Sequence, residues 1–107
     1  MIARYWSATT TKPPEEYRRH FTETVVPNLT SLPGFEGCYL LESDQPPGET
    51  RFVTITLWQS TAAIEAFAGP DITRSHVEPE GQAALTQFDR TAVNFTVSVH
   101  VDGGHPE

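Results

Sequence analysis

The sequence predicts an α+β domain of the ferredoxin-like type, in which two strand–helix–strand units interlock into a four-stranded antiparallel sheet. Stretches with the two-residue period of strands alternate with stretches of helical period, in the order βαββαβ. Proline and glycine separate these stretches. The 107 residues suffice for one domain and are too few for two. We therefore expect a single domain over residues 1–101 and a flexible C-terminal tail over residues 102–107.

The first half of the pattern is a strand, a helix and a strand. Ile2–Ala8 contains aromatic and apolar residues without a breaker, which is typical of a strand. A helix is expected to begin near Pro13, because proline is tolerated in a first turn and the following glutamates complement the helix dipole. Pro27 is expected to end or kink this helix. A proline–glycine turn then introduces a second strand over Phe35–Glu42.

The second half repeats the order strand, helix, strand. A polar, proline-rich loop over residues 43–49 leads to a third strand over Arg51–Trp58, so that the second and third strands form a hairpin. A serine N-cap begins a helix over Thr61–Ala68, and a further short helix begins at Pro79. Strict alternation over Thr91–Val101 predicts a long fourth strand.

The strands carry apolar side chains on both of their faces. In each of the first three strands both sides include apolar residues: Ala3 and Tyr5 against Ile2, Trp6 and Ala8, Tyr39 and Leu41 against Cys38 and Leu40, and Val53, Ile55 and Leu57 against Phe52 and Trp58. A sheet covered on one side only should have a polar outer face, and large exposed apolar patches are rare on monomers. We therefore expect a homodimer in which two sheets pack face to face.

Composition excludes several classes of protein. Fourteen acidic residues against seven basic ones give a net charge of −7, which disfavours nucleic acid and anionic membrane surfaces as partners. A single cysteine, Cys38, excludes an internal disulfide or a multi-cysteine metal site. His100 and His105 form only a weak metal pair. We expect no signal peptide, the sequence has no apolar run long enough to span a membrane and no nucleotide-binding motif, and we therefore expect a cytoplasmic protein without cofactor or metal.

Three stretches together resemble the antibiotic biosynthesis monooxygenase superfamily. They are Gly34–Gly37 (GFEG), Thr56–Ser60 (TLWQS) with the helix Ala62–Phe67 (AAIEAF), and the later run from Pro79 to Asp89. The resemblance covers nearly the whole chain in element order. It implies a small dimeric α+β barrel protein of an uncharacterised branch of this superfamily.

The resemblance implies two kinds of activity. Some members are cofactor-free monooxygenases that oxidise polycyclic phenols in a pocket between helices and sheet, and Trp58 matches the tryptophan that they carry at the end of strand three. Others degrade haem with an asparagine, a tryptophan and a histidine. The first two positions hold Ser7 and Phe67 in this sequence, and the third falls on Val77, next to His76.

Seven residues are candidates for a site. His76 is expected to act as a base, because the pKa of imidazole lies near neutrality, although a surface histidine without a role is the alternative. Trp58 is expected to form a wall by stacking on an aromatic substrate, or else to anchor the core. The remaining candidates are Tyr5 and Ser7 as catalytic hydrogen-bonding groups and Phe67, Tyr39 and His20 as substrate-binding residues.

These observations support more than one function. The first hypothesis is a cofactor-independent monooxygenase that acts on a small aromatic or polyphenolic substrate. The alternative is a non-catalytic dimeric module that binds a small ligand or a partner. A haem-related role is a third, weaker reading.

Overall fold

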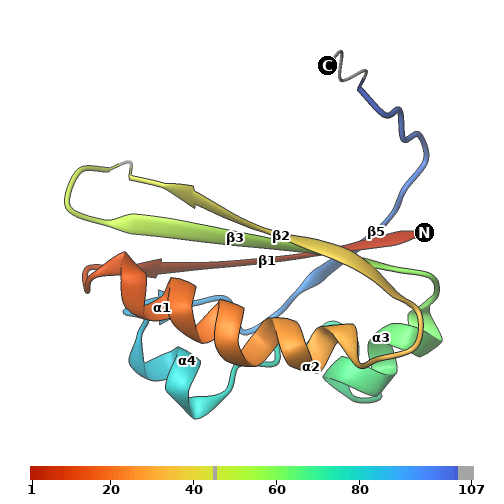
Figure 1. Cartoon of the computed structure of the whole chain (residues 1–107), viewed down its shortest axis with the longest axis horizontal. Helices are drawn as coiled ribbons and strands as arrows, with labels where there is room; N and C mark the ends of the chain where they lie inside the picture. Colours follow the sequence, from red (N-terminus) through yellow and green to blue (C-terminus); the bar gives the residue numbers. More distant parts are fainter. Residues whose placement is uncertain (45, 104–107) are drawn as a thin grey trace.

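A single twisted sheet lies against a layer of helices, and the sheet's other face is left uncovered. The computed structural model describes residues 1–44 and 46–103. Figure 1 shows the helices gathered on one side of the sheet. Of the predicted tail, residues 104–107 lie outside the described residues, and His105 with them.

The sheet has the strand order of a ferredoxin-like fold. Its strands are β1 (Ile2–Thr10), β2 (Phe35–Ser43), β3 (Thr50–Trp58), β4 (Gln87–Phe88) and β5 (Val93–Thr96). The order is β2-β3-β1-β4, and β5 also pairs directly with β1. β4 pairs with the end of β1 and β5 with its beginning, and all neighbouring strands are antiparallel. β1 is therefore central, as interlocking of the two halves requires, and the predicted fold class is confirmed.

The first helix continues through the proline that was predicted to end or kink it. It runs through α1 (Pro14–His20), a π-helical turn η1 (Phe21–Val25) and α2 (Val26–Thr30). Pro27 lies in the first turn of α2, directly after the π-helical turn. The helix does not end at Pro27, so that part of the prediction is wrong, and the change from π-helical to α-helical structure directly before Pro27 marks where the helix accommodates a residue without an N–H.

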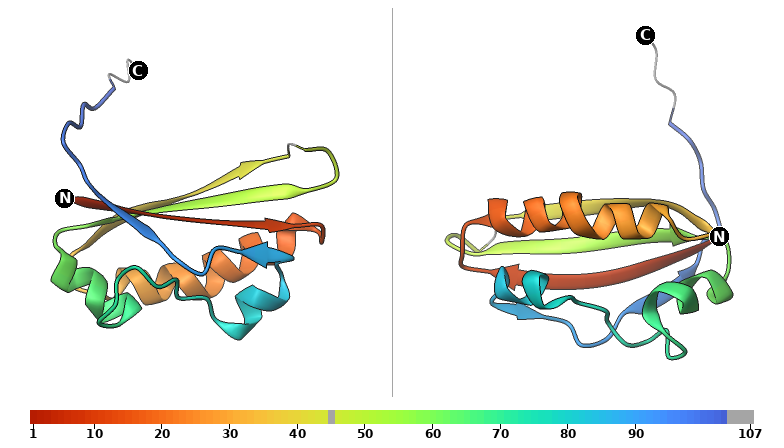
Figure 2. Two further views of the ribbon diagram at one scale, coloured as in Figure 1. Left: turned by 180° about the vertical axis from the view of Figure 1, so that it is seen from behind. Right: turned by 60° about the horizontal axis from the view of Figure 1, so that its bottom comes forward.

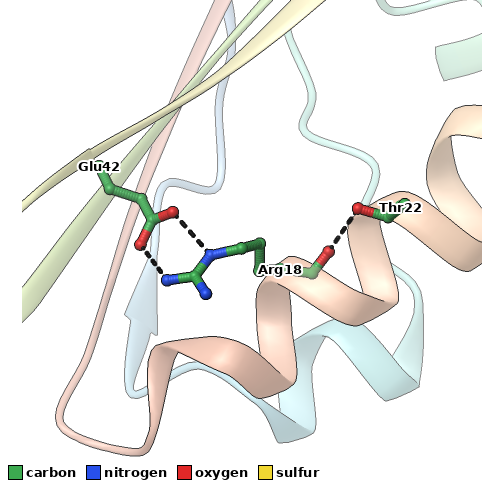
Figure 3. Close-up of polar contacts among 3 residues, drawn as sticks. All are labelled: Arg18, Thr22 and Glu42. Atoms are coloured by element: carbon green, nitrogen blue, oxygen red, sulfur yellow. Dashed lines mark hydrogen bonds and ion pairs between the residues drawn. The ribbon is translucent and has the colours of Figure 1, made fainter.

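The helix is held to the sheet by an ion pair near its first turns. The guanidinium of Arg18 donates through Nε and Nη2 to the two carboxylate oxygens of Glu42 on β2, at 2.9 and 2.8 Å (Figure 3). Such forked pairs fix geometry as well as adding energy. The pair lies at the surface and remote from the cavity described below.

The second half contains α3 (Thr61–Ala68) and α4 (Pro79–Ala83). The predicted serine cap is present, since Oγ of Ser60 accepts a hydrogen bond from the backbone N–H of Ala63. A segment without regular helix, residues 69–78, joins α3 to α4 and is called the covering loop below. An isolated bridge between Arg74 and Thr91 ties it to the chain before β5.

The predicted long fourth strand is wrong in extent. Pairing occurs in two short pieces, β4 and β5, and β5 ends at Thr96. The reason is geometric: Thr96 pairs with Ile2, and the N–H of Val97 already reaches the carbonyl of Met1, so β1 offers nothing further to pair with. The alternating valines beyond this point extend away from the body of the molecule in both views of Figure 2.

The core lies between the inner sheet face and the helices. One cluster centres on Trp6, Tyr17, Phe21 and Phe52, and a second on Leu29, Trp58 and Ile64. Alternate positions of β3 are buried, and burial also alternates along β1 except at Ser7, which is buried between Trp6 and Ala8.

The outer sheet face carries apolar side chains in the open. Register places Tyr39, Ile55, Tyr5 and Val93 in one row across the sheet. Tyr39 is 59% exposed and Phe95 54% exposed. Within the described residues, no helix is long and apolar enough to cross a membrane.

Candidate functional site

A small cavity lies between the inner sheet face, the first helix and the covering loop. Its volume is about 50 Å³. β1 and β3 contribute its floor, the first helix one wall, and α3 with the covering loop the other wall. The residues that line it are Arg4, Trp6, Tyr17, His20, Phe21, Val25, Leu29, Thr54, Thr56, Phe67, Ser75, His76, Val77 and Glu78.

Arg4 places a buried positive charge on the floor of this cavity. It projects from the helix-covered face of β1 and is only 4% exposed. Its Nη1 donates to the backbone carbonyl of Ile72 and, at 3.4 Å, to Oδ1 of Asn94, and its Nη2 donates to the carbonyl of Arg74 at 2.6 Å. Asn94 also donates to the Ile72 carbonyl. Arg4 therefore joins β1, β5 and the covering loop.

The charge of Arg4 has no carboxylate partner among the residues that the structure describes. None of their ion pairs includes Arg4. Burial lowers the pKa of its guanidinium, but arginine stays protonated in proteins. Glu78 also lines the cavity, yet its Oε1 accepts a hydrogen bond from Asn28 on α2. The cavity floor is therefore positive in a protein with a net charge of −7.

His76 stands at the mouth of the cavity. It belongs to the covering loop, lines the cavity and is exposed to solvent on its outer side. Its ring contacts Phe67 of α3 edge to face, with 5.1 Å between the ring centroids. A base in this position contacts the cavity and can also pass a proton to solvent water.

His20 is buried on the opposite wall. Its side chain is 7% exposed, and Nδ1 has no hydrogen-bond partner among the described residues. The nearest acid is Glu80, with Oε2 3.7 Å from Nδ1. The centroid of the Tyr17 ring lies 6.0 Å from that of the His20 ring, and burial raises the pKa of the Tyr17 phenol. Tyr17 is therefore a neutral hydroxyl at neutral pH.

Trp58 lies behind the cavity. It is fully buried, its Nε1 donates to Oγ1 of Thr56 at 2.8 Å, and its ring lies 5.7 Å from that of Phe67. Thr56 and Phe67 line the cavity, whereas Trp58 does not. Trp58 thus supports two lining residues from the second cluster of the core.

Tyr5, Ser7 and Tyr39 lie on the other face of the sheet. Nη2 and Nε of Arg51 donate to the hydroxyls of Tyr5 and Ser7, at 2.6 and 3.1 Å. Ser7 also borders a separate hollow of about 390 Å³ at the edge of the sheet, beside β4. The two-residue period of a strand accounts for the separation, because the odd-numbered residues of β1 face away from the helices. These three residues therefore do not meet His76, Phe67 and His20.

The cysteine and the metal-binding groups add no chemistry to the site. Cys38 is half-buried on β2, and burial raises the pKa of its thiol, which disfavours the reactive thiolate. Among residues 1–44 and 46–103, there is no group of three or more metal-ligating side chains.

Three of the residues predicted from the sequence, His76, Phe67 and His20, line this cavity. Arg4 and Tyr17 also line it, and the sequence did not lead us to predict them. A signal for Arg4 was available. An arginine at an inward-facing position of a central strand is unusual, because this residue is rarely buried without a partner.

Comparison with known proteins identifies a sequence family and a shared fold. The sequence model of the antibiotic biosynthesis monooxygenase family matches residues 8–79. No curated protein matches the sequence.

Several solved structures share the fold. One is SnoaB, a cofactor-independent oxygenase from Streptomyces nogalater, with 20% identity over 95% of this chain and 98% of that one, at a TM-score of 0.62. Another is a mutant of MhuD with two manganese protoporphyrin IX molecules bound per active site, with 23% identity over 96% of this chain and 100% of that one, at a TM-score of 0.61. At these identities the likeness concerns the fold.

Proposed function

The chain belongs to the antibiotic biosynthesis monooxygenase family, and on that basis we propose that it is a cofactor-independent monooxygenase acting on a small aromatic or polyphenolic substrate. The observation that carries the proposal is the cavity itself. It joins aromatic walls to a buried cation and to a histidine at its mouth. Apolar pockets with a few convergent polar groups are the usual form of a small-molecule site.

In the proposed reaction, His76 removes the proton of a phenol, or of a methylene activated by aromatic rings. The anion is stabilised on the cavity floor, and its electron-rich carbon reacts with dioxygen. For a methylene, one oxygen atom becomes a carbonyl, and the other leaves as water together with the two hydrogens. For a phenol, one oxygen atom becomes the second carbonyl of a quinone, and the other leaves as water with the hydrogen of that ring carbon and the hydrogen of the phenol. Oxidant and product then balance without a metal or flavin.

The size of the cavity limits how a substrate enters. About 50 Å³ is far less than the roughly 300 Å³ or more of typical ligand pockets. A substrate therefore requires displacement of the covering loop. Hydrogen bonds at Thr73 and Ser75 tie that loop to residues 90–92, whereas His76 lies beyond these ties. The residues that follow His76 are also tied, because the carbonyl of Val77 accepts a hydrogen bond from Gln82 and the carboxylate of Glu78 accepts one from Asn28.

We also propose that the protein is a homodimer formed by the outer sheet faces. The exposed apolar side chains Tyr39, Leu41, Val93 and Phe95 support this proposal, since monomers rarely leave such a face uncovered. A partner sheet would bury this face and surround Tyr5 and Ser7.

Oxygen uptake tests the proposed activity. The protein is mixed with an anthrone-like phenol, and consumption of dioxygen is followed with an electrode. We expect uptake by the native protein and a loss of about 100-fold in His76→Ala, within the usual range for a general base. His100→Ala, at an exposed histidine paired with Asp102, is the matched control and retains full activity. Uptake that is unchanged in His76→Ala removes the assignment of the base.

A non-catalytic, ligand-binding module is the second candidate function. The small volume of the cavity favours it, because a closed interior suits a small ligand better than turnover of a large ring system. Binding of a small phenol without any uptake of dioxygen would support this candidate over the enzyme.

A further inference from the structure

The environment of Arg4 goes beyond the structural needs of a buried arginine. Three hydrogen bonds to neutral oxygens occupy Nη1 and Nη2. An arginine side chain has five N–H groups, so two of them, including that on Nε, have no acceptor among the described residues. Arg4 therefore has two N–H groups left to offer to a ligand oxygen.

Nε of Arg4 is not sealed in the core. In the described part of the chain, the one buried side-chain nitrogen or oxygen without a partner is Nδ1 of His20. Nε of Arg4 therefore retains some access from outside the packed atoms. The cavity is the open space that this side chain lines.

No carboxylate among the described residues forms a hydrogen bond or an ion pair with Arg4. Most of the other lining residues are aromatic or aliphatic, and the two threonines and Ser75 are uncharged. Glu78 is the one carboxylate among the lining residues, and Asn28 binds it. A charge in an apolar, water-poor space interacts more strongly than at a surface, so the cavity favours an anion.

We propose that Arg4 binds the oxyanion of an aromatic ligand, a phenolate or an aromatic carboxylate, through its unused N–H groups. The inference rests on the proposed function, because it concerns the same cavity, and it names the charge state of the ligand and the residue that selects it. Arg4, on the cavity floor, binds the anion that forms when His76, at the mouth, removes a proton. Phe67 and Trp6 contact the ring.

Arg4 also ties three segments together, so a stability effect alone does not establish ligand binding. Asn94 separates the two roles. Asn94→Ala removes the bond to Arg4 and the bond to the Ile72 carbonyl, yet it leaves the guanidinium in place. Arg18→Gln removes a surface arginine that is remote from the cavity and serves as a control for net charge.

The experiment uses para-nitrophenol, whose phenolate is coloured, with the full-length protein. The apparent pKa of the bound probe is measured by absorbance across pH, together with the thermal unfolding midpoint of each variant. We expect the native protein to lower the probe's pKa by about one unit, a tenfold preference for the phenolate. Arg4→Gln is expected to abolish this preference, and Arg4→Lys to retain part of it. Asn94→Ala and Arg18→Gln are expected to retain it fully, even where Asn94→Ala unfolds earlier.

Competition by benzoate shows whether the site binds aromatic carboxylates as well as phenolates. Displacement of the phenolate by benzoate extends the site to aromatic carboxylates, and failure to displace it assigns the site to phenolates. The proposal is overturned if the native protein binds neither probe, binds without preference for the anion, or keeps the preference in Arg4→Gln. Anion binding that depends on Arg4 without any uptake of dioxygen leaves this inference standing and removes only the proposed monooxygenase.

Discussion

Phe67 and His76 meet edge to face, with 5.1 Å between their ring centroids and 69° between their planes. This contact connects α3, which the sequence predicts well, to the covering loop, which has no regular structure. Phe67 in turn lies 5.7 Å from Trp58. The proposed base is thus held against the second cluster of the core through one aromatic ring.

Replacing Phe67 tests whether this ring positions His76. We expect Phe67→Ala to destabilise the fold by about 1–3 kcal/mol, because the side chain is only partly buried. The loss of oxygen uptake should exceed what unfolding explains and should appear mainly in kcat. Phe67→Leu, which keeps an apolar side chain of somewhat smaller volume without the edge-to-face contact, should recover most of the stability and little of the activity. Steady-state kinetics and urea unfolding provide the readouts, and equal recovery of both properties by leucine would contradict the positioning role.

Gly81 fits closely against His20. A Cβ at this position would lie 3.0 Å from Nε2 of His20 and 3.2 Å from Cδ2. Alanine is favoured over glycine within a helix by about 1 kcal/mol, so the sign of Gly81→Ala depends on this contact. We expect Gly81→Ala to destabilise the native protein but to stabilise the His20→Ala background. Urea unfolding of the four variants provides a double-mutant cycle, and an absence of coupling would show that the His20 ring yields freely.

The pair of Arg18 and Glu42 predicts a dependence of stability on pH. The hydrogen bond from Arg18 lowers the pKa of the Glu42 carboxyl. A group whose pKa is lower in the folded state contributes stability above its unfolded pKa, and this contribution is lost as pH falls through the folded pKa. Glu42→Gln should therefore lower the thermal midpoint at about pH 7 and leave it nearly unchanged at about pH 3.

Salt should weaken the same effect, because both partners are partly exposed. Glu36→Gln is the control, since Glu36 is an exposed glutamate of β2 without an ion pair among the described residues. A similar loss in Glu36→Gln would show that net charge, rather than the pair, sets the midpoint.

The proposed dimer predicts that a charge on the outer sheet face will separate the protomers. Phe95 is 54% exposed on β5 and lies opposite Ala3 in the ladder. We expect the native protein to sediment as a dimer at micromolar concentration, and Phe95→Asp to sediment as a monomer because burying a carboxylate there is costly. Ala62→Asp, in the exposed first turn of α3, should remain dimeric. A native protein that sediments as a monomer would remove the proposed interface.

Much of the fold follows from the sequence, because its signals are local. Alternation in β1 and β3 assigns each residue to a face, and proline, glycine and serine mark the ends of helices. The same reasoning failed at Pro27 and beyond Thr96. A local pattern does not show that a π-helical turn precedes the proline, nor that β1 ends where the valines continue.

The sequence by itself determined the strand order, the two faces of the sheet and the presence of His76 and Phe67 near one pocket. Only the tertiary structure decided that Arg4 is buried beside Asn94 and the covering loop, and that Tyr5, Ser7 and Tyr39 lie across the sheet from His76. The physical reason is distance along the chain. Arg4 and Asn94 are 90 residues apart, and what neutralises or exposes a charge depends on which remote segments pack around it.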